Sequence, residues 1–254
     1  MQSSAGELFF YKKTLAVLWR QRYNQIMVKT ILIDLDDTIF DFKACEKQAL
    51  SAVLVKLGLP FDDRDIADYS KINDSMWKLL EKGEITREEL RTRRFLLFLE
   101  RYGNPVDPAV FADLYMEMLS QTDVLLDGAR ELLEYLSENY RLYAVTNGYV
   151  KTQTGRIRKA DIGKYFKDIF ISQNVGAPKP QKKFFDYCAA HIPAFSIEST
   201  VLIGDSPTSD ISGGNEYGIF TIRYNPKKEA NPVDKQPQKE VYSLKDIPNL
   251  LLSL

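Results

Sequence analysis

The chain has 254 residues, with 34 basic and 35 acidic side chains and a formal net charge of −1. This length allows one α/β domain with a smaller insertion, and 44% hydrophobic residues is typical of a water-soluble globular protein. The balanced charge argues against nucleic acid or a membrane surface as a partner, because both select clustered positive charge. We therefore expect a cytoplasmic protein whose two cysteines stay reduced.

The N-terminal stretch, residues 1–26, is expected to be an extension outside the folded domain. Its apolar run, residues 14–19, is interrupted at once by Arg20 and Arg22. Such a run is too short for a signal peptide or a membrane span. The first clear strand pattern begins only near residue 29.

The apolar run at residues 31–33 leads directly into the sequence Asp-Leu-Asp-Asp-Thr at residues 34–38. This pattern predicts a buried strand over residues 29–35, and it places Asp34 and Asp36 where the strand leaves its sheet. At ~4 Å and an effective dielectric constant of ~20, two like charges repel by about 4 kcal/mol. The pair therefore indicates a bound cation, a raised pKa of a carboxyl group, or both.

Residues 41–123 have helical patterns throughout and no convincing strand. Apolar spacing, interrupted by glycine and proline, predicts four helices, over residues 42–57, 63–80, 86–102 and 107–120. A helical insertion directly after the first strand would lie over the carboxyl end of that strand, where α/β sheets bind their ligands. We therefore expect residues 41–123 to form a cap domain.

From residue 124 onwards, predicted strands and helices alternate. Strands are expected at residues 142–145, 169–171, 200–203, 219–222 and 241–242, and helices at 129–138, 150–160, 181–190, 208–217 and 244–253. This rhythm predicts a Rossmann-like, doubly wound parallel sheet of the α/β class. Residues 27–40 and 124–254 would together form this core domain.

Polar residues follow several of these apolar runs in a fixed order. They are Thr146, Asn147 and Gly148 after the second strand, Lys179 in the loop 176–180, and Asp205 after the strand at 200–203, with Asp210 five residues further on. Each has a plain structural explanation, such as turn formation at residues 146–148 or a helix start at Asp210. All four groups at strand ends, counting the acids at 34–38, favour one shared site instead.

The ordered set resembles the haloacid dehalogenase (HAD) superfamily of phosphohydrolases, over about residues 29–254. The resemblance implies that Asp34 is a nucleophile that forms an aspartyl-phosphate, and that Asp36 is a general acid and base. It implies a Mg²⁺ cofactor held by Asp34, by the backbone carbonyl of Asp36 and by Asp205. Dehalogenases of the superfamily lack an acid at the position of Asp36, since a halide leaves without a proton, so a phosphatase is favoured.

The other residues of the set would serve the phosphate. Lys179 and the Thr146 hydroxyl would bind phosphoryl oxygens and act in catalysis, and backbone N–H groups near Asn147 and Gly148 would add to that binding. Asp210 would hold Lys179 or a metal-bound water.

A finer resemblance is to bacterial nucleotidases that act on pyrimidine and noncanonical nucleoside monophosphates. It rests on Asn73 with Trp77, on Tyr149 after Gly148, and on residues 176–187. It predicts a nucleoside 5′-monophosphatase with a nucleotide as its small-molecule partner. Two alternatives stay open: a phosphatase for phosphoglycolate or a sugar phosphate, and a non-catalytic phosphometabolite-binding protein of the same fold. No pattern indicates an oligomeric state.

Overall fold

The computed structural model describes residues 27–254, so the predicted extension, residues 1–26, lies outside the described residues. Its centre is a parallel six-stranded sheet with strand order β3-β2-β1-β4-β5-β6. The predicted α/β, doubly wound fold is confirmed. The strands are β1 (Thr30–Ile33), β2 (Arg141–Thr146), β3 (Asp168–Ile171), β4 (Thr200–Gly204), β5 (Phe220–Tyr224) and β6 (Lys239–Val241).

The helices lie within a few residues of their predicted positions. They are α2 (Phe42–Leu57), α3 (Asp63–Glu81), α4 (Arg87–Leu99), α5 (Pro108–Ser120), α6 (Ala129–Asn139), α7 (Val150–Lys159), α8 (Ser172–Val175), α9 (Lys182–His191), α10 (Ser212–Tyr217) and α11 (Ile247–Leu252). Two features differ from the prediction. Helix α8 was not expected, because four residues are too few to show a helical period. The helix expected at 208–217 begins instead with a π-helical turn, Pro207–Ile211.

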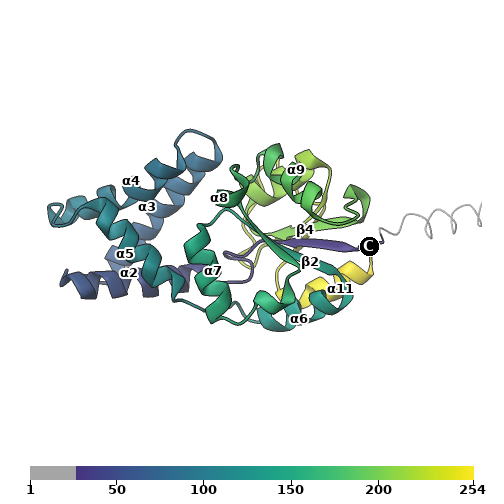
Figure 1. Cartoon of the computed structure of the whole chain (residues 1–254), viewed down its shortest axis with the longest axis horizontal. Coiled ribbons are helices and arrows are strands. Elements are labelled where there is room, and N and C mark those ends of the chain that lie inside the picture. Colours follow the sequence, from purple (N-terminus) through teal and green to yellow (C-terminus); the bar gives the residue numbers. More distant parts are fainter. Residues whose placement is uncertain (1–26) are drawn as a thin grey trace, which may run out of the picture.

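Both faces of the sheet are covered by helices. Ile31 and Ile33 pack in the apolar layer that contains α6 and α11, whereas Leu32 between them packs in the opposite layer with α9. Figure 1 shows α6 and α11 on one side of the strands and α9 on the other. All three β1 side chains are fully buried, as a continuous apolar strand in a parallel sheet requires.

Strand β1 ends earlier than predicted, at Ile33. The sheet hydrogen bonding nevertheless continues for one residue, because the Asp34 N–H donates to the Ile203 carbonyl at 2.9 Å. The Asp34 backbone is thereby held at the carboxyl edge of the sheet, next to the end of β4.

Helices α2 to α5 form a bundle to one side of the sheet (Figure 1). Its apolar core is aromatic: Tyr69 stacks on Phe95 at a centroid distance of 5.4 Å, and Tyr115 lies 5.1 Å from Phe95. Capping boxes at Asp62 and Thr86 begin α3 and α4 by satisfying free N–H groups of their first turns. Residues 41–123 thus contain helices and no strand.

The bundle joins the rest of the chain through a close contact between α5 and α7. Gly155 of α7 faces Ser120, the last residue of α5, and both are buried. A Cβ at position 155 would lie 2.6 Å from the Ser120 carbonyl oxygen and 2.8 Å from its Cβ. Because one of these atoms is backbone, the two helices could not keep their spacing around a larger residue.

We expect Gly155→Ala to lower the free energy of unfolding by about 1–3 kcal/mol, because the added methyl overpacks this helix contact. Denaturant unfolding followed by circular dichroism measures the change. Thr154→Ala is the matched control, since residue 154 is exposed on the same helix and should shift stability by less than about 0.5 kcal/mol. Equal free energies of unfolding for the two variants would show that the space around Gly155 is not as tight as described.

Candidate active site

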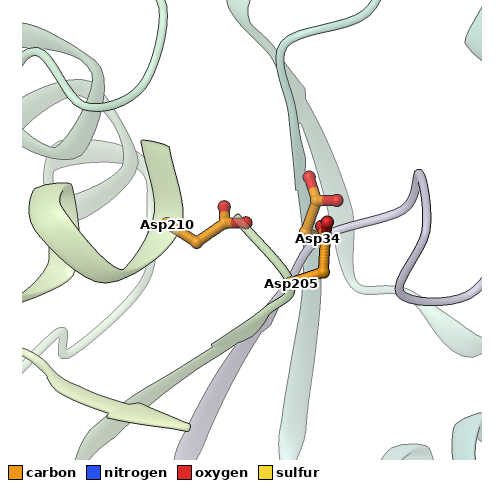
Figure 2. Close-up of side chains that lie close together, drawn as sticks. All are labelled: Asp34, Asp205 and Asp210. Carbon is orange, nitrogen blue, oxygen red and sulfur yellow. The ribbon is translucent and has the colours of Figure 1, made fainter. Parts of the chain in front are cut away.

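Three carboxylates meet at the carboxyl end of the sheet. Asp34 follows β1 and Asp205 follows β4, and these strands are neighbours with Ile33 paired to Ile203. Asp210 comes from the π-helical turn beyond β4. One carboxylate oxygen from each lies within 4.8 Å of the other two. Figure 2 shows Asp34 and Asp205 side by side, with Asp210 directed toward them from its helical turn.

The Lys179 ammonium is the cation inside this cluster. Its Nζ donates to Asp34 Oδ1 at 2.6 Å, to Asp210 Oδ1 at 2.6 Å, and to the Val145 carbonyl at 2.9 Å. These bonds use all three ammonium donors. Although burial opposes the charged form, the carboxylates of Asp210 and Asp34 raise the pKa of Lys179, so this residue stays cationic.

The Asn147 side chain positions Lys179 through its backbone. Its Oδ1 accepts from the Lys179 N–H at 2.8 Å, and its Nδ2 donates to the Lys179 carbonyl at 2.9 Å. This reciprocal pair ties the loop 176–180 to the end of β2. The neighbouring Gly148 N–H donates to the Thr146 hydroxyl oxygen at 3.1 Å.

Asp210 can reach the cluster because residue 204 is glycine. A Cβ at position 204 would lie 2.4 Å from the Asp210 carboxyl carbon. The Asp210 Oδ2 also accepts the Ser206 N–H at 3.1 Å. The carboxylate is therefore anchored both to Lys179 and to the backbone after β4.

Asp205 lacks such support within residues 27–254. The Thr38 hydroxyl donates to its Oδ1 at 3.4 Å, and Arg223 contacts only its backbone carbonyl, through Nε at 3.1 Å. Burial, followed by the negative charges of Asp210 and Asp34, raises the pKa of the Asp205 carboxyl well above its usual range.

The Asp34 carboxyl is in a similar environment. Burial is the largest influence and raises its pKa to about 8, Lys179 opposes this shift, and the charges of Asp210 and Asp36 add to it. A cation at this point would favour the ionised form of both Asp34 and Asp205.

The Asp36 carboxylate is bound by two side chains of helix α7. It forms an ion pair with Arg156 Nη1 of α7, and its Oδ2 accepts from Gln153 Nε2 at 2.7 Å. The same Gln153 nitrogen donates to the Thr146 hydroxyl at 2.8 Å. Asp36 and Thr146, both predicted from the sequence as site residues, are thus linked through one amide.

A cavity of about 570 Å³ opens over these residues, lined on one side by Asp34, Thr146 and Asp205 and on the other by bundle residues Phe42, Asn73 and Trp77. Arg87 and Glu81 are among the bundle side chains that contact the sheet domain beside this cavity. Arg87 donates to the Asn147 carbonyl at 3.1 Å and to the Ser172 hydroxyl at 2.6 Å, and Glu81 accepts from the Thr208 hydroxyl.

Sequence reasoning missed Gln153, Arg156 and Arg87. Gln153 and Arg156 are three residues apart and therefore lie on one face of α7, a spacing that is visible in the sequence. Their helix is rich in polar residues, however, so its pattern does not indicate that this face is buried. Arg87 is the first residue of its helix and resembles any surface arginine.

Comparisons with known proteins agree with this geometry. A family model for haloacid dehalogenase-like hydrolases matches residues 31–224. The pyrimidine 5′-nucleotidase PynA of Streptococcus pneumoniae is 40% identical over 221 residues, which cover 86% of this chain and 93% of that protein. The pyrimidine 5′-nucleotidase YjjG of Escherichia coli is 29% identical over 221 residues, covering 87% and 96%.

The HAD-hydrolase YfnB of Bacillus subtilis is 38% identical over 223 residues, covering 88% of this chain and 95% of that protein. Its magnesium-bound crystal structure superposes with a TM-score of 0.85, covering 88% of this chain and 98% of that one. The family match and the similarity to these three relatives confirm the resemblance expected from the sequence. The chain belongs to the haloacid dehalogenase-like hydrolases.

Proposed function

We propose that this protein is a Mg²⁺-dependent phosphatase that hydrolyses nucleoside 5′-monophosphates through an aspartyl-phosphate. The observation that carries the proposal is the Lys179 ammonium held between Asp34 and Asp210, with Asp205 alongside. This arrangement offers a carboxylate nucleophile in a site whose fixed positive charge suits a phosphate.

In the first step an Asp34 carboxylate oxygen attacks phosphorus, and the bond from phosphorus to the ester oxygen breaks. Asp36 gives its proton to that oxygen, so the product leaves as a neutral alcohol. In the second step water attacks the phosphorus of the aspartyl-phosphate while Asp36 takes up a proton from it. Inorganic phosphate leaves, and Asp34 and Asp36 return to their starting forms.

Lys179 would place its positive charge beside the phosphoryl oxygens during both steps, and the Thr146 hydroxyl would donate a hydrogen bond to one of them. The ammonium already lies 2.6 Å from the Asp34 carboxylate, so it is in place to hold the phosphate next to the nucleophile. The Thr146 hydroxyl is oriented by two neighbours, the Gly148 N–H and the Gln153 amide. The backbone N–H of Asn147 would complete this site, whereas that of Gly148 is already bonded to Thr146.

The residues of the acid cluster fit a magnesium ion. Three carboxylates share one ammonium among residues 27–254, so the ionised cluster has an excess of negative charge and an uncompensated Asp205. Mg²⁺ prefers carboxylate oxygens and waters, and two or three ligands from the protein are enough for it. Asp34, Asp205 and the Asp36 backbone carbonyl would hold it, and it would reduce the repulsion between Asp34 and an anionic phosphate.

The bundle of α2 to α5 would act as the cap, with the domain boundaries predicted at residues 41–123. Its Arg87 and Glu81 contacts link it to the loops at both sides of the acid cluster. Its Trp77 ring lies 6.3 Å from that of Tyr149, beside the cavity. An aromatic surface there suits a nucleobase, which stacks well on such rings.

The substrate class rests on the cavity and on the relatives. With its aromatic lining and about 570 Å³ the cavity has the size of a small-molecule site. Two relatives that match most of this chain are pyrimidine 5′-nucleotidases. The complete acid set argues against a non-catalytic binding protein, for which these buried carboxylates would only lower stability.

A panel of phosphorylated metabolites tests the substrate class. With Mg²⁺ present we expect UMP and dTMP to be hydrolysed with higher kcat/KM than phosphoglycolate or sugar phosphates, and EDTA should stop phosphate release. Phosphate liberated from each compound is measured with a colorimetric assay. Higher turnover of sugar phosphates would move the assignment to the alternative phosphatase, and no release from any compound would refute hydrolysis.

We expect Asp34→Asn to lose turnover to background, because an amide cannot form the aspartyl-phosphate, while UMP binding with Mg²⁺ stays measurable by calorimetry. Asp37→Asn is the matched control, since Asp37 Oδ1 accepts the Phe42 N–H at 3.2 Å and an amide oxygen preserves that bond. This control should retain most of the activity. Turnover by Asp34→Asn would exclude Asp34 as nucleophile.

The raised carboxyl pKa values predict how stability depends on pH without metal. Asp34, with a pKa of about 8, and Asp205 bind protons more tightly in the folded chain than in the unfolded one. In EDTA the free energy of unfolding should therefore fall by about 4 kcal/mol from Asp34 alone as the pH rises from about 5 to about 8. Denaturant titrations at each pH measure it. Millimolar Mg²⁺ should reduce this fall, and a fall that Mg²⁺ leaves unchanged would contradict the metal site.

A further inference from the structure

Arg156 of α7 is a fully buried arginine with one acidic neighbour. Its side chain has no solvent exposure, and Asp36 is the carboxylate with which it pairs in the part of the chain that the structure describes. Its guanidinium carbon lies 4.0 Å from the centre of the Phe40 ring. Its Nε and Nη2 have no hydrogen-bond partner among residues 27–254. The group is therefore desolvated and only partly compensated.

Such an arrangement contributes little to stability. A buried ion pair loses about as much from desolvation as it gains from attraction, and an apolar side chain of similar volume often serves a fold better. The two nitrogens without partners, Nε and Nη2, make the balance less favourable still. The effect of Arg156 on its partner is the more informative consequence.

Arg156 and Gln153 bracket the Asp36 carboxylate from the same face of α7. Arg156 pairs with Oδ1 and Gln153 donates to Oδ2 at 2.7 Å, so both oxygens have fixed neighbours. The bracket is itself tied together, since Arg156 Nη1 donates to Gln153 Oε1 at 3.2 Å. A carboxylate held at both oxygens cannot rotate freely about its side-chain bonds.

We propose that Arg156 is a positioning residue for Asp36, which directs the Asp36 carboxyl group to the ester oxygen of the substrate. This rests on the proposed function and adds a residue to it. Arg156 itself neither gives nor takes a proton in the reaction, because its guanidinium group stays protonated at any working pH. Asp36 gives its proton to the ester oxygen as that oxygen leaves phosphorus, and the bracket keeps the carboxyl group within reach of it.

Leaving-group dependence separates this role from a purely structural one. A nucleoside 5′-alcohol needs a proton to leave, whereas p-nitrophenolate leaves without one. With Mg²⁺ present, kcat/KM reports the steps up to release of the alcohol or phenolate. Arg156→Met should lower kcat/KM for UMP by ~10²-fold, within the range of a general acid, and for p-nitrophenyl phosphate by less than ~10-fold.

Asp36→Asn provides the comparison, and Arg158→Met the control. Asp36→Asn should show the same preference for p-nitrophenyl phosphate over UMP. Adding Arg156→Met to Asp36→Asn should lower kcat/KM for UMP by less than a further ~3-fold, because the effects of residues that act as one unit are not additive. Residue 158 is exposed on the same helix, so Arg158→Met should match the wild type. Melting temperatures verify that each variant folds. If Arg156→Met does not fold, Arg156→Lys is tested in its place.

The outcomes distinguish the two levels of the proposal. Equal losses on both substrates in Arg156→Met, or a full further loss in the double variant, would overturn the positioning role while leaving the phosphatase assignment intact. If Asp36→Asn itself lowers kcat/KM equally for both substrates, Asp36 is not the general acid and the proposed reaction is wrong.

Discussion

The site depends on one buried ammonium among acids that would otherwise repel one another. Lys179 touches Asp34 and Asp210 at the same distance, 2.6 Å, and is itself held by its backbone through Asn147. Attraction at such short range in a poorly hydrated place is strong, but the lysine offsets only part of the negative charge. The fold thus brings acids together more closely than its own cations can balance, which is the electrostatic condition for receiving a metal ion.

Keeping those acids together requires rigid surroundings. Each comes from the end of a strand, or from the turn just beyond it, and the strands are covered by apolar layers on both faces. Asp34 is held to the sheet by its backbone N–H, and Gly204 leaves the space that Asp210 occupies. The stability of the sheet thereby offsets the unfavourable burial of the carboxylates, as is common where function conflicts with stability.

Much of this could be predicted because it follows from topology. The carboxyl ends of neighbouring parallel strands meet, so Asp34 and Asp205 had to converge once β1 and β4 were recognised. The partner of Asp36 could not be predicted, since it depends on how α7 is rotated against the sheet. A helix containing several lysines and arginines gives no apolar stripe from which to infer that rotation, and a buried Arg156 looks like a solvated one. The side-chain bonds of Asn147 likewise need a distant loop in place.

Helix α7 connects features that are far apart in the chain. It begins at Val150, shortly after Thr146. Its Arg156 holds Asp36, and its Gly155 packs against Ser120 at the end of the bundle. Because a helix moves largely as a unit, any shift of α5 against α7 would also displace the bracket around Asp36. A shift of the bundle can therefore reach Asp36 through α7, by the same close packing that a single methyl group at position 155 would disturb.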